Sequence, residues 1–354
     1  MSSEPSAMSP GKLWGLRRLA DEQGRFKMLA VDQRPPIKNL VAEGRGTAEG
    51  SYEDVAHVKR TLVEELRAHS SAILLDPHYA YPTAIDAVPA HKGLLLTLEN
   101  SVFEETPGGR RSTAIDDWSV NKIKRVGGDA VKVLAWYRPD ADPEINEYQK
   151  AFVARIGDEC RKHDIPFLFE LLVYSFPADS EHTTGYVEQP GKRAEHVLES
   201  IETFAGPEYG VDVFKVESPL SAADLAEPDS GAAADEAQRL FNEVDRVSPV
   251  PWVMLSAGAT QTAFRRVLTY AYRAGASGFL AGRAIWWDAL QTFPDHEVTL
   301  ESLRTQSAPY MADIGSMTDA DALPFFSHRR FAPDGPTIAH RDGSFRHEYP
   351  EAAP

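Results

Sequence analysis

Eight apolar runs recur along the chain, each with the length and composition of a buried β-strand. Most of them are nearly continuous in apolar residues instead of alternating, which is typical of parallel strands that helices cover on both faces. The runs are residues 26–32, 71–77, 93–99, 130–136, 166–172, 212–218, 251–258 and 278–283.

The segments between these runs carry apolar residues at helical spacing. Ser51, Asp142 and Thr260 each precede such a segment, in the position of a helix N-cap residue. A short amphipathic helix is predicted within residues 12–21. Residues 78–92 contain two prolines and have room for a stunted helix at most.

Strands that alternate with helices over 354 residues predict an α/β fold, and a TIM (β/α)8 barrel is the leading architecture. A doubly wound open sheet is the alternative. That fold binds dinucleotides with a glycine-rich turn after the first strand, but here Gln33, Arg34 and two prolines follow the first run. The sequence therefore favours the barrel.

We expect a single barrel domain over residues 11–300, extended at both ends. Residues 1–10 have the composition of a disordered segment, and residues 301–354 are expected to form a C-terminal extension. The chain is predicted to become irregular after Asp295. Its last part is rich in Pro, His, Arg and Gly and is expected to be a tail, either disordered or laid on a neighbouring subunit.

The net charge of −16 excludes broad classes of partner, since such a surface repels nucleic acids and anionic membranes. Residues 1–10 lack an apolar targeting segment, and no run approaches the ~20 apolar residues of a membrane span. The single cysteine, Cys160, rules out an internal disulfide and suits a reducing compartment. We therefore expect a cytoplasmic protein with no nucleic-acid or membrane partner, in which a local basic site holds any anionic ligand.

Four ionisable residues stand inside predicted strands, at positions where the alternation of side chains points them away from the apolar, helix-facing positions. They are Asp32, Lys132, Glu170 and Lys215. Asp76, Glu99 and Ser256 close their own strands in a similar way. Catalytic groups of a barrel sit where its strands end, so we expect the four to meet at one mouth of the barrel.

A structural interpretation of the same residues stays open. Lys215 could pair with Glu217 or reach water at the end of its strand, and the four groups together could form a buried charge network. Buried ionic clusters stabilise proteins poorly compared with apolar packing, so their accumulation favours a function.

Two lysines beside a carboxylate suit amine catalysis. A lysine near its ordinary pKa of about 10.4 is protonated at neutral pH and cannot attack a carbonyl. Burial or a second ammonium nearby frees the amine, so Lys132 and Lys215 can activate one another. Glu170, on the strand between them, is placed to move protons while an imine forms and a C–C bond breaks. Asp32 is placed to orient substrate hydroxyls or the amine.

No metal ion or other cofactor is expected, because the 11 histidines show no metal-ligand spacing. An anion site is expected after the last two strands, where such sites recur in barrel enzymes. Ser256 and Gly258 offer a hydroxyl and backbone N–H groups before a helix. Gly282 and Arg283 offer a close approach and a guanidinium.

The motifs VDQR, SAILLDP, GGDAVKVLAWY, VDVFKVESP, LSAG and GRAIW, in this order and spacing, resemble the LacD-type class I aldolases. This family comprises tagatose 1,6-bisphosphate aldolase and relatives such as the sulfofructose-phosphate aldolases. The resemblance implies that Lys215 is the Schiff-base lysine and Glu170 the acid/base carboxylate, with Lys132 and Asp32 as their active-site companions.

The same resemblance implies that Ser256, Gly258 and Arg283 hold a substrate phosphate or sulfonate, while Arg34 holds the other anionic end. The sequence departs from the family pattern after VDQR, where Pro35 and Pro36 are expected to stiffen the loop beside the sugar.

The activity that the resemblance implies is cleavage of a phosphorylated ketohexose, such as tagatose 1,6-bisphosphate, into dihydroxyacetone phosphate and glyceraldehyde 3-phosphate. Two alternatives use the same lysine imine, namely a sulfofructose-phosphate aldolase and a transaldolase. An alternative of another class is a non-catalytic, regulatory barrel that binds sugar phosphates. The expected partners are a small sugar phosphate and further copies of the chain in a homo-oligomer.

Overall fold

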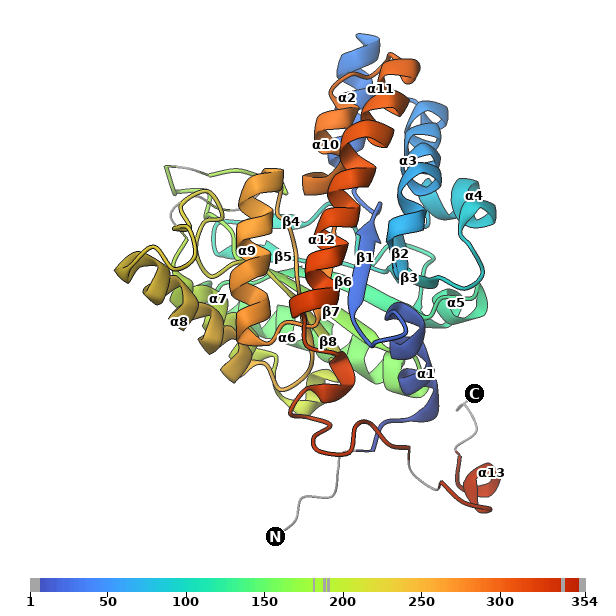
Figure 1. Cartoon of the computed structure of the whole chain (residues 1–354), viewed down its shortest axis with the longest axis vertical. Helices are drawn as coiled ribbons and strands as arrows, with labels where there is room; N and C mark the ends of the chain where they lie inside the picture. The colour runs from blue at the N-terminus through green and yellow to red at the C-terminus, as the bar shows by residue number, and fades with distance from the viewer. Residues whose placement is uncertain (1–6, 181, 187–188, 190–191, 339–340, 350–354) are drawn as a thin grey trace.

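A closed barrel of eight parallel strands forms the centre of the protein (Figure 1). The computed structural model describes residues 7–180, 182–186, 189, 192–338 and 341–349. Around the barrel the strands follow the order β1-β10-β9-β8-β7-β6-β3-β2, and this closed order confirms the TIM barrel and excludes the open sheet. The barrel strands are β1 (Phe26–Ala30), β2 (Ala72–Leu75), β3 (Gly93–Thr97), β6 (Ala130–Trp136), β7 (Phe167–Leu172), β8 (Val213–Val216), β9 (Trp252–Met254) and β10 (Gly278–Ala281).

Each predicted run contains one barrel strand, and the run 130–136 coincides with β6. The other runs are longer than their strands because the apolar pattern continues into buried loop residues. Leu255 and Ala257, for example, are buried beyond the end of β9. A sequence pattern reports burial, whereas a strand ends where its ladder of hydrogen bonds ends.

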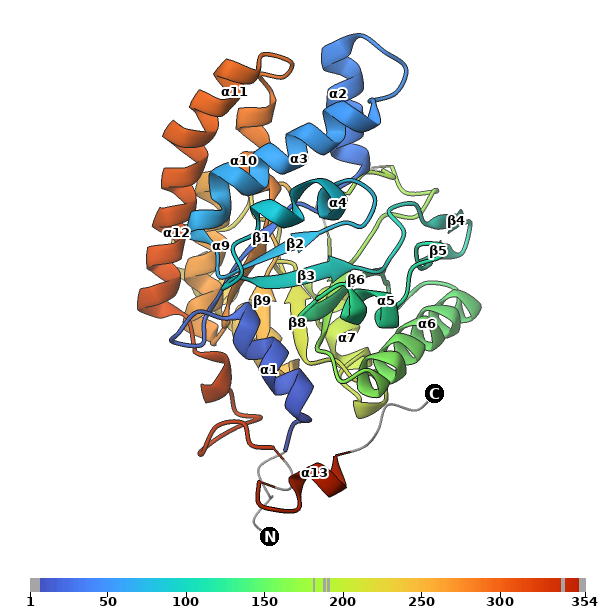
Figure 2. The same ribbon diagram turned by 90° about the vertical axis from the view of Figure 1, so that its right-hand side faces the viewer.

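Helices surround the barrel (Figure 2). The predicted caps are confirmed: Ser51, Asp142 and Thr260 precede helices and accept hydrogen bonds from the backbone N–H groups of their first turns. The helices are α1 (Pro10–Leu19), α2 (Pro35–Arg45), α3 (Tyr52–Leu66), α4 (Ala80–Ala84), α5 (Val120–Arg125), α6 (Pro143–Lys162), α7 (Ala194–Thr203), α8 (Ala232–Val247), α9 (Gln261–Ala274), α10 (Arg283–Leu290), α11 (His296–Ser302), α12 (Ala308–Asp321) and α13 (Phe345–Glu348).

The chain does not become irregular after Asp295, so that prediction is wrong. Asp295 caps α11, and a π-helical segment, Leu303–Ser307, joins α11 to α12. α12 contacts α9, α3, α10 and β1 and buries Met311 and Ile314. Because α10 has eight residues, α12 supplies the outer cover that the last β/α unit would otherwise lack. The expected boundary at residue 300 falls inside α11.

The described segments before α1 and around α13 lie beneath the barrel, at its N-terminal face (Figure 1). Phe325 and Phe331 join Phe26 and Leu16 in a buried cluster, so this part of the tail lies on its own barrel. Met8 is 4% exposed and its N–H donates to Thr337 O at 2.8 Å, which contradicts a disordered segment at that position. Residues 1–6 lie outside the described part of the chain.

Pro35 and Pro36 begin α2 instead of stiffening a loop. At the first positions of a helix the missing N–H of proline has no intrahelical partner to lose, so proline starts a helix well. The expectation of a rigid loop at this point is therefore wrong.

The barrel interior is layered, and the layers follow the alternation of side chains along the strands. Val213 joins an inner, mostly aliphatic cluster, the one that also contains Phe26, whereas Phe214 and Val216 join the outer cluster between strands and helices. A second inner apolar cluster, which includes Leu134 and Leu172, lies nearer the strand ends. The ionisable positions of β6, β7 and β8 fall between these two inner layers.

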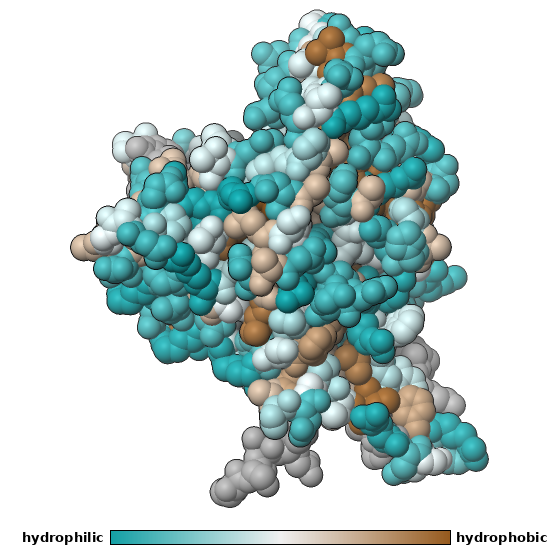
Figure 3. Space-filling view, in the orientation of Figure 1, coloured by the Kyte–Doolittle hydropathy of each residue, from teal (hydrophilic) through white to brown (hydrophobic). Residues whose placement is uncertain are grey.

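The face seen in Figure 3 is mostly hydrophilic, with apolar residues scattered over it. Exposed large apolar side chains, such as Trp14 on α1 and Val298 on α11, are far apart along the chain. Among the described residues, none of the helices is both long and apolar enough to cross a membrane. The expectation of a homo-oligomer stays a prediction.

Candidate active site

Lys132 lies at the centre of a buried cluster of charges. Its Nζ is 2.9 Å from Asp32 Oδ2, 2.6 Å from Glu99 Oε1 and 2.8 Å from Glu170 Oε2. All four side chains are at least nine-tenths buried. One ammonium thus compensates three carboxylates, and this pairing makes their burial tolerable.

Lys215 faces the other oxygen of Glu170. The two residues are register partners on β8 and β7, and Lys215 Nζ lies 2.9 Å from Glu170 Oε1. Glu170 therefore bridges the two lysines. Lys215 does not pair with Glu217, whose carboxylate instead contacts Lys192 and the N–H of Val173.

The surroundings shift the pKa values of the two lysines in opposite directions. Burial, with the nearby ammonium of Lys132, lowers the pKa of Lys215 below its ordinary value, although Glu170 acts in the opposite direction. Burial would also lower the pKa of Lys132, but the carboxylates of Asp32, Glu170 and Glu99 together raise it well above its ordinary value. Lys215 is thus the better candidate for a neutral amine, and Lys132 stays an ammonium.

The two lysines favour the charged form of Asp32 and Glu170. Burial would raise the pKa of Asp32, but Lys132 and Lys215 outweigh it and lower the pKa to about 2. Burial likewise opposes ionisation of Glu170, and the same two lysines lower its pKa. Glu170 is therefore a carboxylate that can accept a proton from a group beside Lys215.

Tyr186 covers this cluster from the segment between β7 and α7. Its hydroxyl donates a short hydrogen bond to Glu170 Oε1, the oxygen that also faces Lys215. The ring lies under the guanidinium of Arg283, with Cζ 5.0 Å from the ring centroid. Tyr186 also lines a pocket of ≈ 250 Å³ together with Asp32 and Glu99.

The predicted anion-binding residues gather on one side of this mouth. Gly258 has φ +85°, and a Cβ at this position would lie 3.3 Å from Arg283 Nη1. Arg283 Nη2 is buried and has no hydrogen-bond partner among the described residues, and Ser256 is 7% exposed. The absence of a side chain at Gly282 has a packing reason, because a Cβ there would lie 2.6 Å from Ala30 O.

Arg34, which follows β1 in the sequence, lines the same pocket as Asp32, Glu99 and Tyr186. Its Nη2 donates to Glu99 O at 3.0 Å. Its Nε and Nη1 are buried without a hydrogen-bond partner in the part of the chain that the structure describes, and Gln33 Oε1 is in the same state. Buried guanidinium N–H groups without a partner in the described ranges suit an oxyanion as acceptor.

All the candidate residues of the sequence therefore lie at or beside one barrel mouth. Two further residues belong to the cluster without a role having been assigned to them from the sequence, Glu99 and Tyr186. Glu99 closes its strand as a carboxylate, which is a usable signal, and Thr97 Oγ1 orients it by donating to Glu99 Oε2 at 2.5 Å. Tyr186 lies in a loop without periodic pattern, so the sequence gives no signal for it.

No group of three or more His, Cys, Asp or Glu side chains is arranged to hold a metal ion within the described ranges. The prediction that the protein needs no metal or other cofactor stays a prediction.

Residues 26–288 match the family described as "DeoC/LacD family aldolase". The chain is 38% identical over 328 residues to a tagatose 1,6-diphosphate aldolase of Listeria monocytogenes, covering 90% of this chain and 95% of the relative. It is 34% identical to the enzyme of the same name from Staphylococcus aureus, covering 86% and 94%.

Solved structures confirm the fold. A fructose-bisphosphate aldolase from Plasmodium falciparum superposes with a TM-score of 0.64 at 14% identity, covering 90% of this chain and 98% of that one. An archaeal fructose 1,6-bisphosphate aldolase gives a TM-score of 0.55 at 16% identity, covering 87% and 98%. From the family match and the sequence relatives, the chain belongs to the DeoC/LacD family of aldolases and is a lyase.

Proposed function

We propose that this aldolase works through an imine on Lys215 and cleaves tagatose 1,6-bisphosphate into dihydroxyacetone phosphate and glyceraldehyde 3-phosphate. The observation that carries the proposal is the bridge of Lys215, Glu170 and Lys132, in which only the first lysine has a lowered pKa. The relatives named tagatose 1,6-diphosphate aldolase support the choice of substrate.

The reaction begins with attack of the neutral Lys215 amine on the ketone carbon C2. Proton transfers to the oxygen of the carbinolamine release water and leave an iminium ion, and Glu170 is in contact with Lys215 to carry those protons. Lys132, which remains an ammonium, keeps Glu170 ionised between transfers.

Carbon–carbon cleavage then needs a base at the C4 hydroxyl. Glu170 accepts that proton, the C3–C4 bond breaks, and its electron pair moves into the iminium to give an enamine, while C4 leaves as the aldehyde carbon. Protonation of the enamine at C3 and hydrolysis of the imine release dihydroxyacetone phosphate and restore Lys215. Asp32, beside Lys132, is placed to orient the substrate hydroxyls.

The two arginines suit a substrate with an anion at each end. Arg283, with Ser256 and Gly258, would hold one phosphate, and the guanidinium of Arg34, whose Nε and Nη1 have no partner among the described residues, would hold the other. These donors must supply most of the attraction for a dianion, because the chain as a whole carries a charge of −16.

Borohydride trapping tests the imine. Incubation with dihydroxyacetone phosphate and sodium borohydride should add the reduced adduct to Lys215, as located by peptide mass spectrometry, and abolish turnover. Lys215→Met is the matched control and should give no adduct. An adduct on Lys132 would reverse the assignment of the two lysines, and a protein without any adduct would be the regulatory barrel.

A substrate panel tests the ketose. Tagatose 1,6-bisphosphate should give the highest kcat/KM for release of dihydroxyacetone phosphate, ahead of fructose 1,6-bisphosphate and sulfofructose phosphate. Preference for the sulfonate would make the protein a sulfofructose-phosphate aldolase. Transfer of the three-carbon ketone unit to an acceptor aldehyde, without free dihydroxyacetone, would make it a transaldolase.

A further inference from the structure

Tyr186 contacts two groups of the proposed reaction, the acid/base Glu170 and the anion-binding Arg283. Its hydroxyl donates to Glu170 Oε1, and its ring lies under the guanidinium of Arg283. Trp136 packs against the same ring edge-to-face at 5.8 Å between centroids. The tyrosine is therefore fixed in both position and rotation beside the reacting carboxylate.

The surroundings of the hydroxyl favour its protonated form, which is the hydrogen-bond donor. Burial and the charge of Glu170 raise the pKa of Tyr186 well above its ordinary value, so the proton stays on the phenol. A hydrogen bond donated to a carboxylate favours the charged form of that carboxylate. Tyr186 thereby supports Glu170 as a base and fixes the direction of the oxygen that faces Lys215.

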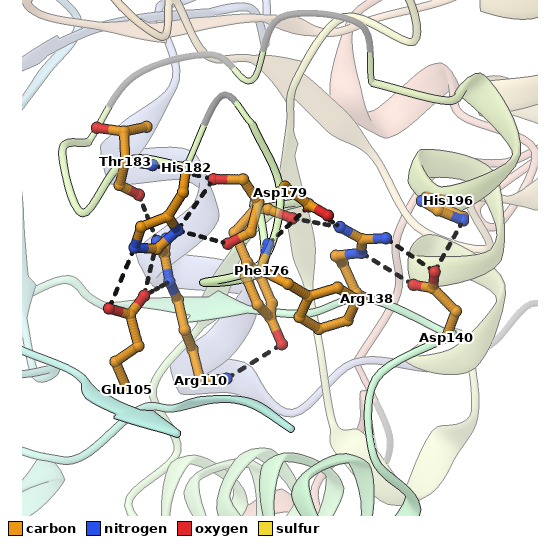
Figure 4. Close-up of polar contacts among 11 residues, drawn as sticks. Glu105, Arg110, Arg138, Asp140, Phe176, Asp179, His182, Thr183 and His196 are labelled. Carbon is orange, nitrogen blue, oxygen red and sulfur yellow. Dashed lines mark hydrogen bonds and ion pairs between the residues drawn. The ribbon is translucent and has the colours of Figure 1, made fainter. Parts of the chain in front are cut away.

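A separate element holds the segment that carries Tyr186. The antiparallel hairpin of β4 (Glu104–Thr106) and β5 (Gly109–Arg111) projects from the connection after β3. Its Arg110 donates a short hydrogen bond to Thr183 O, and its Glu105 Oε2 lies 3.3 Å from His182 Nε2 (Figure 4). His182 and Thr183, which make these contacts, stand four and three residues before Tyr186 in the sequence.

Arg110 is itself rigidly held. It is 1% exposed and lies over the rings of Phe103, Trp136 and Tyr174, with Cζ 4.2, 4.7 and 4.8 Å from their centroids. Its guanidinium also contacts Glu105 Oε1 at 3.2 Å. A cation stacked on aromatic faces and paired with a carboxylate is a firm anchor.

The start of the same segment has its own anchor. Arg138 lies over the ring of Phe176 at 3.9 Å and contacts Asp179 Oδ2 at 3.2 Å, and that carboxylate accepts from the N–H of Phe176 (Figure 4). The segment that leads to Tyr186 is therefore anchored by side chains that do not belong to the charge cluster.

We propose that Tyr186 is a positioning residue for Glu170 in the aldolase reaction, and that the β4–β5 hairpin sets its place through Glu105 and Arg110. This inference rests on the proposed function of Glu170 as the acid/base. A tyrosine that only covered the site would need its ring and not its hydroxyl, and this difference makes the inference testable.

Tyr186→Phe removes the hydroxyl and keeps the ring under Arg283. We expect kcat to fall about 10-fold to 100-fold, the usual worth of a hydrogen bond to a charged group, with KM within about 3-fold of wild type. The acid limb of the kcat/KM profile should move to higher pH, because Glu170 loses a donor. The other charged groups that face Glu170 (Lys132, Lys215, Asp32 and Arg283) all remain.

Tyr148→Phe is the control for loss of a tyrosine hydroxyl, since Tyr148 lies on α6 and donates to Ser112 O at 3.2 Å. It should leave kcat, KM and the pH profile unchanged. A Tyr186→Phe enzyme that matched this control would overturn the inference.

Glu105→Gln tests the hairpin without touching the charge cluster. It should lower kcat in the same direction as Tyr186→Phe, and the double variant should lose no more than Tyr186→Phe alone, because both changes act through one hydroxyl. Glu104→Gln, on the same hairpin, changes a carboxylate that is 58% exposed and paired with Arg111, and should leave kcat unchanged. Fully additive losses, or a Glu105→Gln enzyme with normal kcat, would overturn the part assigned to the hairpin.

Trapping separates this inference from the proposed function. Wild-type protein and Tyr186→Phe should both form the borohydride adduct at Lys215. If wild type forms it and Tyr186→Phe keeps normal kcat, the aldolase mechanism stands and the inference fails. If wild type forms no adduct, the proposed function itself fails. Should Tyr186→Phe not fold, Glu105→Gln becomes the test: a lower kcat with the acid limb moved to higher pH supports the inference, and a kcat and pH profile equal to those of Glu104→Gln overturn it.

Discussion

Lys215 and Glu170 are register partners on adjacent strands, and Nζ of the lysine lies 2.9 Å from Oε1 of the glutamate. Parallel strands hold such partners at a fixed spacing, so the contact does not depend on a flexible loop. The proposed nucleophile and its proton carrier are thus in contact before the substrate arrives. Preorganised groups avoid the cost of ordering them during the reaction.

Glu170→Gln should separate imine formation from turnover. The amide keeps the shape and can still hydrogen-bond, but it cannot accept the C4 hydroxyl proton. We expect kcat to fall by about 10²–10⁴-fold, the usual contribution of a positioned acid/base, while slow borohydride trapping at Lys215 persists. Near-normal kcat would mean that the carboxylate only holds the lysines, and that Asp32 or a substrate phosphate oxygen carries the proton.

Lys132 and Lys215 should differ in their contribution to stability. Lys132→Met leaves three buried carboxylates without their shared cation and should lower the free energy of unfolding by about 3–5 kcal/mol. Lys215→Met removes a buried amine that contacts one carboxylate, which Lys132 still compensates. It should be close to neutral or stabilising, as often occurs at active sites.

Urea unfolding of the two variants at neutral pH measures this difference, with wild type as the reference. Equal destabilisation would show that Glu170 is compensated by both lysines alike, and would contradict the central place given to Lys132.

The two ends of the substrate should depend on different arginines. Arg283→Ala should raise KM about 30-fold, equivalent to about 2 kcal/mol for a lost charge-assisted contact, and affect kcat much less. Arg34→Ala should do the same for the bisphosphate but change little for a ketose 1-phosphate or 6-phosphate that lacks the anion at its end. Steady-state kinetics with the bisphosphate and both monophosphates would show which arginine serves which end. An unchanged KM in both variants would place the phosphates elsewhere.

The charge cluster could be predicted from the sequence because its signal is local. Side chains alternate along a strand, so an ionisable residue among apolar neighbours of opposite parity must face the barrel interior. This reasoning placed Asp32, Lys132, Glu170 and Lys215 together, and it applies equally to Glu99. The alternation of strands and helices along the chain likewise predicted that the strands are parallel and form a barrel.

Residues that depend on loops and long-range packing could not be predicted in the same way. Tyr186 and Arg110 reach the site through stacked rings and backbone contacts between segments far apart in the sequence. α12 contains Pro309 near its start and Gly315 in its middle, so its sequence lacks a strong helical pattern. Packing against α9, α3, α10 and β1 stabilises this helix, and such long-range contacts leave no local pattern in the sequence.

The underside of the barrel contains a histidine that should make the protein sensitive to acid. His328 is 1% exposed, between Phe325 and Phe331 of the buried cluster, and its Nδ1 accepts from the N–H of Arg330 at 3.2 Å. Its Nε2 has no hydrogen-bond partner among the residues described. Burial, with the positive charges of Arg329 and Arg330, lowers the pKa of His328 to about 4 from an ordinary 6.5.

The sign of the pH effect follows from this lowered pKa. Between pH 6.5 and about 4 the unfolded chain binds a proton at His328 that the folded protein does not bind. Stability from this group is therefore complete above pH 6.5 and is lost as the pH falls towards 4, by about 2 kcal/mol at pH 5. His328→Phe removes the titrating group, so its urea midpoint should fall less between pH 7 and pH 5 than that of wild type. His347→Phe, at an exposed position in α13, is the matched control and should follow wild type. A His328→Phe protein that loses as much stability as wild type over this range would show that other groups control the acid sensitivity.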